Sequence, residues 1–84
     1  MYVAIQHTIH DPENFWQTAD KELAALPEGF KIVSVLPNPD GKICNCLWEV
    51  ESVEALQAMM DDKFGPYAQN LCYEVNPPKA VGLP

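Results

Sequence analysis

The order of its hydrophobic periodicities restricts the fold of this 84-residue chain more than any other feature of the sequence. Residues 2–9 alternate between two faces with a period of two, as a β-strand does. The next segment repeats its apolar residues every three or four positions, as an amphipathic helix does. Asp11 and Pro12 suit the N-cap and the first helical position. We expect this helix to extend to Leu26, with apolar positions at Phe15, Ala19, Leu23 and Leu26.

The rest of the chain continues with the order strand, strand, helix, strand. β-Branched residues favour the first of these strands, and Asp40-Gly41 is a strong signal for the turn into the second. Apolar residues then recur at helical spacing until Gly65-Pro66 ends the helix. The predicted ranges are 30–36 and 42–50 for the two strands, 52–64 for the helix and 71–75 for the last strand.

This order predicts an α+β fold of the βαββαβ, or ferredoxin-like, type. Two right-handed crossovers joined by a hairpin give a four-stranded antiparallel sheet with both helices on one face. The first and third strands then lie in the middle of the sheet. We expect one domain over residues 1–84, with a core at 1–76 and a C-terminal tail at 77–84.

The sheet face away from the helices is the informative part of this fold. By simple alternation, the strand at 30–36 is apolar on both faces, with Phe30, Ile32 and Leu36 on one and Val33 and Val35 on the other. These residues are either simply exposed, which is common, or covered by another molecule. We favour a homodimer, because a C2 pair is the simplest cover for a small domain.

A set of short stretches that spans nearly the whole chain supports this interpretation. They are Ile9-His10-Asp11-Pro12, Phe15-Trp16, Cys46-Leu47-Trp48-Glu49, Ser52-Val53, Asn70, Tyr73-Glu74-Val75 and Gly82-Leu83-Pro84. Together they resemble the dimeric α+β barrel superfamily, and within it small bacterial proteins with no settled activity. The resemblance implies that two ferredoxin-like sheets face each other. It implies no mechanism, because the superfamily includes haem-handling proteins, cofactor-free monooxygenases, lactone isomerases and binding proteins.

The charge of the chain argues against two classes of partner. Its net charge is −7, its five basic residues are scattered lysines, and it contains no arginine. Nucleic acids and anionic membranes need clustered basic residues, so we expect neither as a partner. No apolar run approaches the roughly 20 residues that span a bilayer, and the first residues do not resemble a signal peptide. We therefore expect a cytoplasmic protein.

Histidines and cysteines do not form a recognisable metal motif. His7 and His10 are three residues apart, so on a strand they point to opposite faces. Cys44 and Cys46 lack the two-residue gap of zinc and thioredoxin motifs, and Cys72 is expected two strands away. Core packing accounts for these cysteines, and we expect no metal and no cofactor.

The candidate site lies on the covered face of the sheet. Alternation places a few polar groups there among apolar ones, which is typical of a small-molecule site. Glu49 is the only acid among them. A carboxylate with little water can act as a general acid or base, or Glu49 can instead pair with Gln6, Asn45 or the partner chain as part of the dimer contact. The predicted ligand-binding residues are Gln6, Thr8, Asn45, Leu47, Glu49 and, if the last strand has the right phase, Tyr73.

These residues are compatible with several functions. We favour a dimeric protein that binds a small, partly apolar molecule between the sheet and its partner. One alternative is a cofactor-free oxygenase or isomerase with Glu49 as acid and base. Others are a haem- or metal-handling protein that uses His7, and a purely structural dimer. The sequence is compatible with both enzymatic and non-enzymatic functions.

Overall fold

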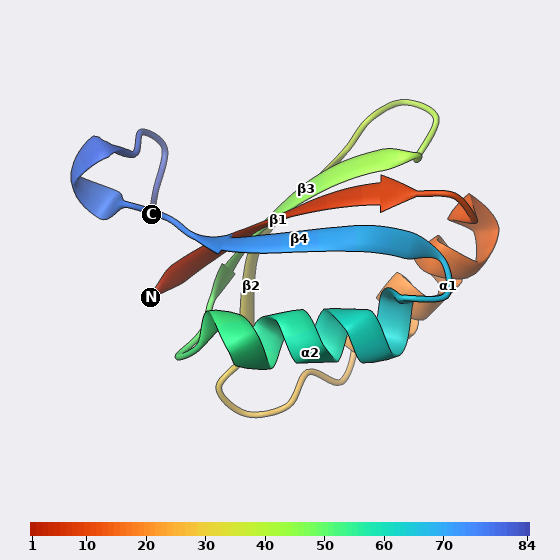
Figure 1. Ribbon diagram of the computed structural model, residues 1–84, viewed down its shortest axis with the longest axis horizontal. Coiled ribbons are helices and arrows are strands. Elements are labelled where there is room, and N and C mark those ends of the chain that lie inside the picture. Colours follow the sequence, from red (N-terminus) through yellow and green to blue (C-terminus); the bar gives the residue numbers. More distant parts are fainter.

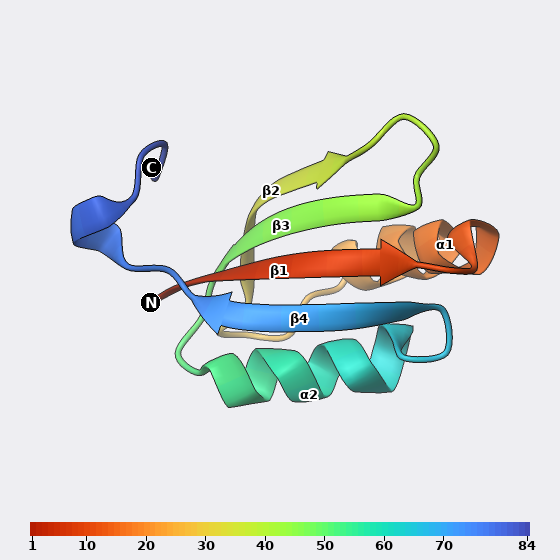
Figure 2. The ribbon, with the colours of Figure 1, turned by 45° about the horizontal axis from the view of Figure 1, so that its top comes forward.

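A computed structural model of the protein describes all 84 residues and confirms the α+β, ferredoxin-like architecture. All strand pairs are antiparallel, and the strand order β2-β3-β1-β4 places β1 and β3 in the middle of the sheet. Both helices lie on the same side of the sheet (Figures 1 and 2). The elements are β1 (Tyr2–Ile9), α1 (Pro12–Leu23), β2 (Lys31–Pro37), β3 (Ile43–Glu49), α2 (Val53–Phe64) and β4 (Ala68–Glu74).

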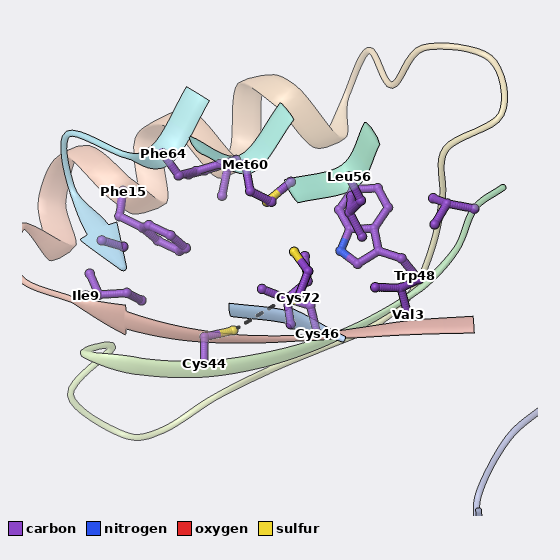
Figure 3. Packing of buried hydrophobic residues seen from close by; sticks show 14 residues of the cluster. Val3, Ile9, Phe15, Cys44, Cys46, Trp48, Leu56, Met60, Phe64 and Cys72 are labelled. Atoms are coloured by element: carbon purple, nitrogen blue, oxygen red, sulfur yellow. Dashed lines mark hydrogen bonds between the residues drawn. The ribbon is translucent and has the colours of Figure 1, made fainter. Parts of the chain in front are cut away.

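The hydrophobic core fills the space between the sheet and the two helices (Figure 3). Every second residue of β1 and β3 points into it, as the predicted alternation requires. The apolar stripes of α1 and α2 close it from the other side. The fully or nearly fully buried members are Val3, Ile5, Ile9, Phe15, Ala19, Cys44, Cys46, Trp48, Val50, Leu56, Met60, Phe64, Ala68 and Cys72.

Side-chain caps set the start of both helices, as the sequence predicts. The carboxylate of Asp11 accepts a hydrogen bond from the backbone N–H of Asn14, and the hydroxyl of Ser52 accepts one from the N–H of Ala55. Neither α1 nor α2 combines the length and the apolar character that a membrane-crossing helix needs.

The helix α1 ends earlier than the apolar stripe suggested. Its last residue is Leu23 and its C-cap is Ala24, so Leu26 lies beyond it. The cause is Pro27, because the residue before a proline is disfavoured in the α conformation. Leu26 still packs against the core from the connecting loop, which explains why it fitted the periodicity without being helical.

Two strands differ from their predicted course. A β-bulge at Val33 shifts the register of β2, so that Ile32 lies opposite Trp48 whereas Ser34 lies opposite Leu47. Ile32 and Val35 therefore both face the helices, and simple alternation was wrong for this strand. In addition, β4 begins at Ala68 rather than at residue 71.

The early start of β4 comes from pairing with β1. Gln69 and Asn70 are poor strand formers, which hid this part of the strand in the sequence. In the fold they lie opposite Thr8 and His7, and the side-chain oxygen of Asn70 accepts a hydrogen bond from the His7 ring. Tertiary pairing thus overrides the local preference of these residues.

The helix α2 lies beside the outer edge of β4 and covers part of it with the side chain of Gln57. The Gln57 amide donates to the carbonyl of Asn70 (2.7 Å) and its oxygen accepts from the N–H of Cys72 (3.0 Å). An uncovered strand edge is a template for pairing with other chains. Gln57 satisfies one donor and one acceptor of this edge, so the middle of β4 is not free to pair with a strand of another chain.

We expect the Gln57→Ala variant to lose about 1–3 kcal/mol of unfolding free energy, because it leaves two partly buried backbone groups of β4 without partners. Urea denaturation measures this loss. The matched control is Gln17→Ala, since Gln17 is exposed on α1 and should change stability by less than about 0.5 kcal/mol. Equal effects of both substitutions would contradict a structural role of the Gln57 contacts.

Candidate functional site

The sheet surface opposite the helices, here called the open face, is formed by the outward residues of all four strands. β-Strand pairing arranges these residues in rows across the sheet. The open face consists of Tyr2, Ala4, Gln6 and Thr8 from β1, Lys31, Ser34 and Leu36 from β2, Ile43, Asn45, Leu47 and Glu49 from β3, and Gln69, Leu71 and Tyr73 from β4.

Its central row joins two amide side chains to two leucines. Gln6 lies directly opposite Asn45 on one side and Leu71 on the other, and Asn45 in turn lies opposite Leu36. Side chains at such directly opposed positions are close enough to contact one another. The middle of the open face is therefore polar and uncharged, and leucines flank it on both edge strands.

Large apolar side chains are unusually exposed on this face. The exposed fractions are 64% for Leu36, 60% for Leu71, 54% for Tyr73 and 47% for Ile43. Most exposed apolar residues of soluble proteins are isolated, whereas gathered ones mark interaction sites. These four belong to one side of one sheet, so the open face has the character of a contact surface.

A hollow of about 400 Å³ marks one end of the open face. Its lining offers amide and hydroxyl groups that can both donate and accept hydrogen bonds, and it carries no charge. A ligand there would be selected by neutral hydrogen-bonding groups and not by charge. The lining residues are Gln6, Thr8, Gln69, Asn70 and Leu71.

Glu49 lies at the opposite end of the face. It is paired across the sheet with Tyr2, and its carboxylate is 3.9 Å from the ammonium group of Lys31. Four residues along β1 separate the rows of Tyr2 and Gln6, which corresponds to about 13 Å at about 3.3 Å per residue. Glu49 is thus an exposed, ion-paired carboxylate remote from the polar centre, and it lines a separate hollow of about 350 Å³.

The structure brings some of the predicted site residues together and separates others. Gln6, Thr8 and Asn45 form the polar centre, and Leu47 and Tyr73 flank Ala4 in the adjacent row, whereas Glu49 stands apart. The phase of β4 places Tyr73, and not Glu74, on the open face. Sequence reasoning missed Gln69, which precedes the predicted start of the last strand, and Leu71, which lies two residues before Tyr73 and so shares its face.

The opposite face of the sheet places His7 in the core. It is 3% exposed, its Nδ1 atom is 2.7 Å from Oδ1 of Asn70, and its ring lies edge-on to Phe15. Burial lowers the pKa of His7, and the hydrogen bond to Asn70 opposes this only in part. His7 therefore points away from the open face, as predicted, and remains neutral at physiological pH.

The three cysteines are also buried on the helix side. The sulfur atoms of Cys44 and Cys46 are 3.8 Å apart without a disulfide. Burial raises the pKa of the thiols of Cys44 and Cys46, and raises that of Cys72 to about 11. Protonated, buried thiols are poor nucleophiles and poor metal ligands. No group of three or more histidine, cysteine, aspartate or glutamate side chains is arranged to hold a metal ion.

The helix side contains little free space. A gap of about 30 Å³ lies among the core side chains of both helices and the sheet, which is room for about one or two water molecules. The buried indole N–H of Trp48 has no hydrogen-bond partner, whereas that of Trp16 donates to the carbonyl of Gly41. The space between the sheet and the helices is therefore too small for a larger molecule.

Comparison with protein-family models, curated proteins and solved structures found no match to this chain. The class that the fold itself defines is the ferredoxin-like α+β sandwich with one open sheet face.

The buried His7 makes stability depend on pH. Because its folded-state pKa is below the unfolded value, the unfolded chain binds the proton more readily, and stability falls as pH drops through about 6.5. We expect the unfolding free energy to decrease between about pH 7.5 and pH 5.5, by at most about 1.4 kcal/mol per pH unit. Urea denaturation at several pH values measures this.

His7→Gln retains the hydrogen-bonding capacity toward Asn70 but cannot titrate, so its stability should change less over this range. His10→Gln, at the exposed second histidine, should retain the wild-type decrease. Hydrogen bonds from Asn14 lower the pKa of Asp11, and a hydrogen bond from its own backbone N–H lowers that of Glu54. Both carboxylates therefore become protonated only at more acidic pH, outside this range. A His7→Gln profile identical to wild type would contradict the assignment.

Proposed function

We propose that this protein is a homodimeric binding protein that pairs through its open face and holds a small, uncharged, partly apolar molecule against it. The observation that carries the proposal is the composition of the face. Neutral hydrogen-bonding groups lie at its centre, and the exposed side chains of Leu36, Leu71, Tyr73 and Ile43 surround them.

A second copy of the chain is the partner that this surface fits best. An isologous C2 contact needs a surface that is compatible with itself, and the middle of the open face meets this condition because it is uncharged. Two chains of net charge −7 repel each other over most of their surfaces. Pairing through the neutral rows avoids direct contact between like charges and removes apolar side chains from water.

The expected ligand follows from the groups that would surround it. Gln6, Asn45, Thr8 and Gln69 can each donate and accept, so they favour a molecule with neighbouring neutral donors and acceptors, such as an amide. The flanking leucines favour an apolar remainder. An acid/base role for Glu49 has less support, because Glu49 is ion-paired with Lys31 at the far end of the face.

The proposal includes membership of the dimeric α+β barrel superfamily and a cytoplasmic location. The ferredoxin-like strand order supports the first, since that superfamily pairs sheets of this kind. The odd number of cysteines, three, supports the second, because they cannot all pair within one chain and buried cysteines without disulfides are typical of proteins in reducing compartments.

Sedimentation equilibrium tests the dimer. We expect the wild-type chain to sediment at twice its 9.4 kDa mass. Leu71→Glu places a charge in the central row and should weaken the dimer by roughly 30-fold or more, equivalent to about 2 kcal/mol. The control Gln17→Glu adds the same charge to the exposed surface of α1 and should leave the dimer intact. A monomeric wild-type chain would refute the proposal.

Benzamide and benzoate, which share an apolar ring but differ in charge, test the ligand chemistry. We expect benzamide to shift the side-chain amide NMR signals of Gln6 and Asn45, and benzoate to shift them much less, because the face offers neutral partners and the chain repels anions. The variants Gln6→Leu and Asn45→Leu assign the two signals. Signals that respond to neither compound, or equally to both, would count against the proposed ligand class.

A further inference from the structure

The segment that follows β4, residues 77–84 and here called the tail, makes no close connection to the rest of its own chain. Its hydrogen bonds are local ones, from Lys79 and Ala80 back to Asn76 and Pro77. None of its side chains joins the hydrophobic core. In Figures 1 and 2 it projects beyond the end of the sheet, near the N-terminus, and turns away from the helices.

The tail is nevertheless rich in apolar residues and contains a regular turn. Five of its side chains are proline, valine or leucine, and its only charged side chain is that of Lys79. Val81 has an exposed fraction of 101%, as high as in an isolated extended peptide. A 3-10 turn at Pro77–Lys79, which contains two prolines, gives its first part a defined course, and the chain bends again at Gly82, whose φ is +95°. A preorganised segment loses less conformational entropy on binding. Within its own chain, however, the tail packs against no part of the hydrophobic core.

We propose that the tail of each protomer packs against the open face of its partner, so that two tails clasp the dimer. This inference rests on the dimer proposed above and adds a second contact to it. Val81 and Leu83 supply the apolar contacts, and the partner's exposed leucines and Tyr73 receive them. Lys79 brings a positive charge toward a partner chain of net charge −7.

The size of the open face supports a second contact. Four strands about 4.8 Å apart and about seven residues long, at about 3.3 Å per residue, give a face of roughly 19 by 23 Å. Two such faces together amount to roughly 870 Å² in flat projection, whereas stable interfaces bury about 1,200–2,000 Å² of accessible surface in total. Two tails of eight residues would enlarge the contact between the faces.

The geometry allows the tail to reach the partner. Facing sheets pack about 10 Å apart. Eight residues span at most roughly 26–29 Å when extended, so the tail crosses this distance even with its turn preserved. It starts at the end of β4, beside Tyr2, where the backbone N–H of Val75 donates to the carbonyl of Tyr2. This anchor places the tail at the border of the open face.

Analytical ultracentrifugation of the full chain and its tail variants tests the clasp. The double variant Val81→Asp/Leu83→Asp should dimerise at least tenfold more weakly than wild type, whereas Val81→Ile should dimerise as wild type does. Circular dichroism should show unchanged folding, since Val81 is fully exposed in the single chain and Leu83 is not part of the hydrophobic core. In a mixture of labelled and unlabelled protein, intermolecular NOEs should connect the Val81 methyl groups to methyl groups of the open face.

The outcomes separate the two proposals. A wild-type dimer that the aspartate variant leaves unchanged, or that shows no intermolecular NOE from Val81, overturns the clasp and leaves the dimer standing. A wild-type chain that stays monomeric overturns the dimer and the clasp together. Selective weakening by the aspartate pair, with intermolecular NOEs from Val81, supports both.

Discussion

Strand β1 connects everything else in this small domain, because it is the only strand hydrogen-bonded to both β3 and β4. Its alternation sends Val3, Ile5, His7 and Ile9 into the core and Tyr2, Ala4, Gln6 and Thr8 to the open face. A one-residue slip of this strand would exchange the two sets and expose the core. The register of β1 therefore fixes the core and the candidate site with one set of hydrogen bonds.

The sequence was sufficient for the architecture because its signals agree with one another. Alternation in β1 and β3, the caps Asp11 and Ser52, and the Asp40-Gly41 turn all favour the βαββαβ order that the structure shows. Where a local signal is overridden by tertiary pairing, prediction failed. Gln69 and Asn70 do not favour a strand by themselves, yet pairing with β1 makes them one.

The candidate site was only partly predictable, because it depends on the phase of two edge strands. The bulge at Val33 turns Val35 inward and leaves Leu36 on the open face. No residue type marks this bulge, since Val33 is β-branched like Ile32 before it and Val35 two residues after it. The early start of β4 likewise decides that Gln69 joins the site. The polar centre itself, Gln6 and Asn45, lies on the regular central strands, where alternation alone is reliable.

The two faces of the sheet differ in the burial and the charge of their polar side chains. On the helix side, burial keeps His7 neutral and the cysteines protonated, so its titratable groups contribute to packing and not to chemistry. On the open side, the middle rows contain no charged side chain, and the charged pair Lys31 and Glu49 lies at one end. A surface of neutral amides among leucines is suited to recognition, because it can bind an uncharged molecule or a second copy without burying an unpaired charge.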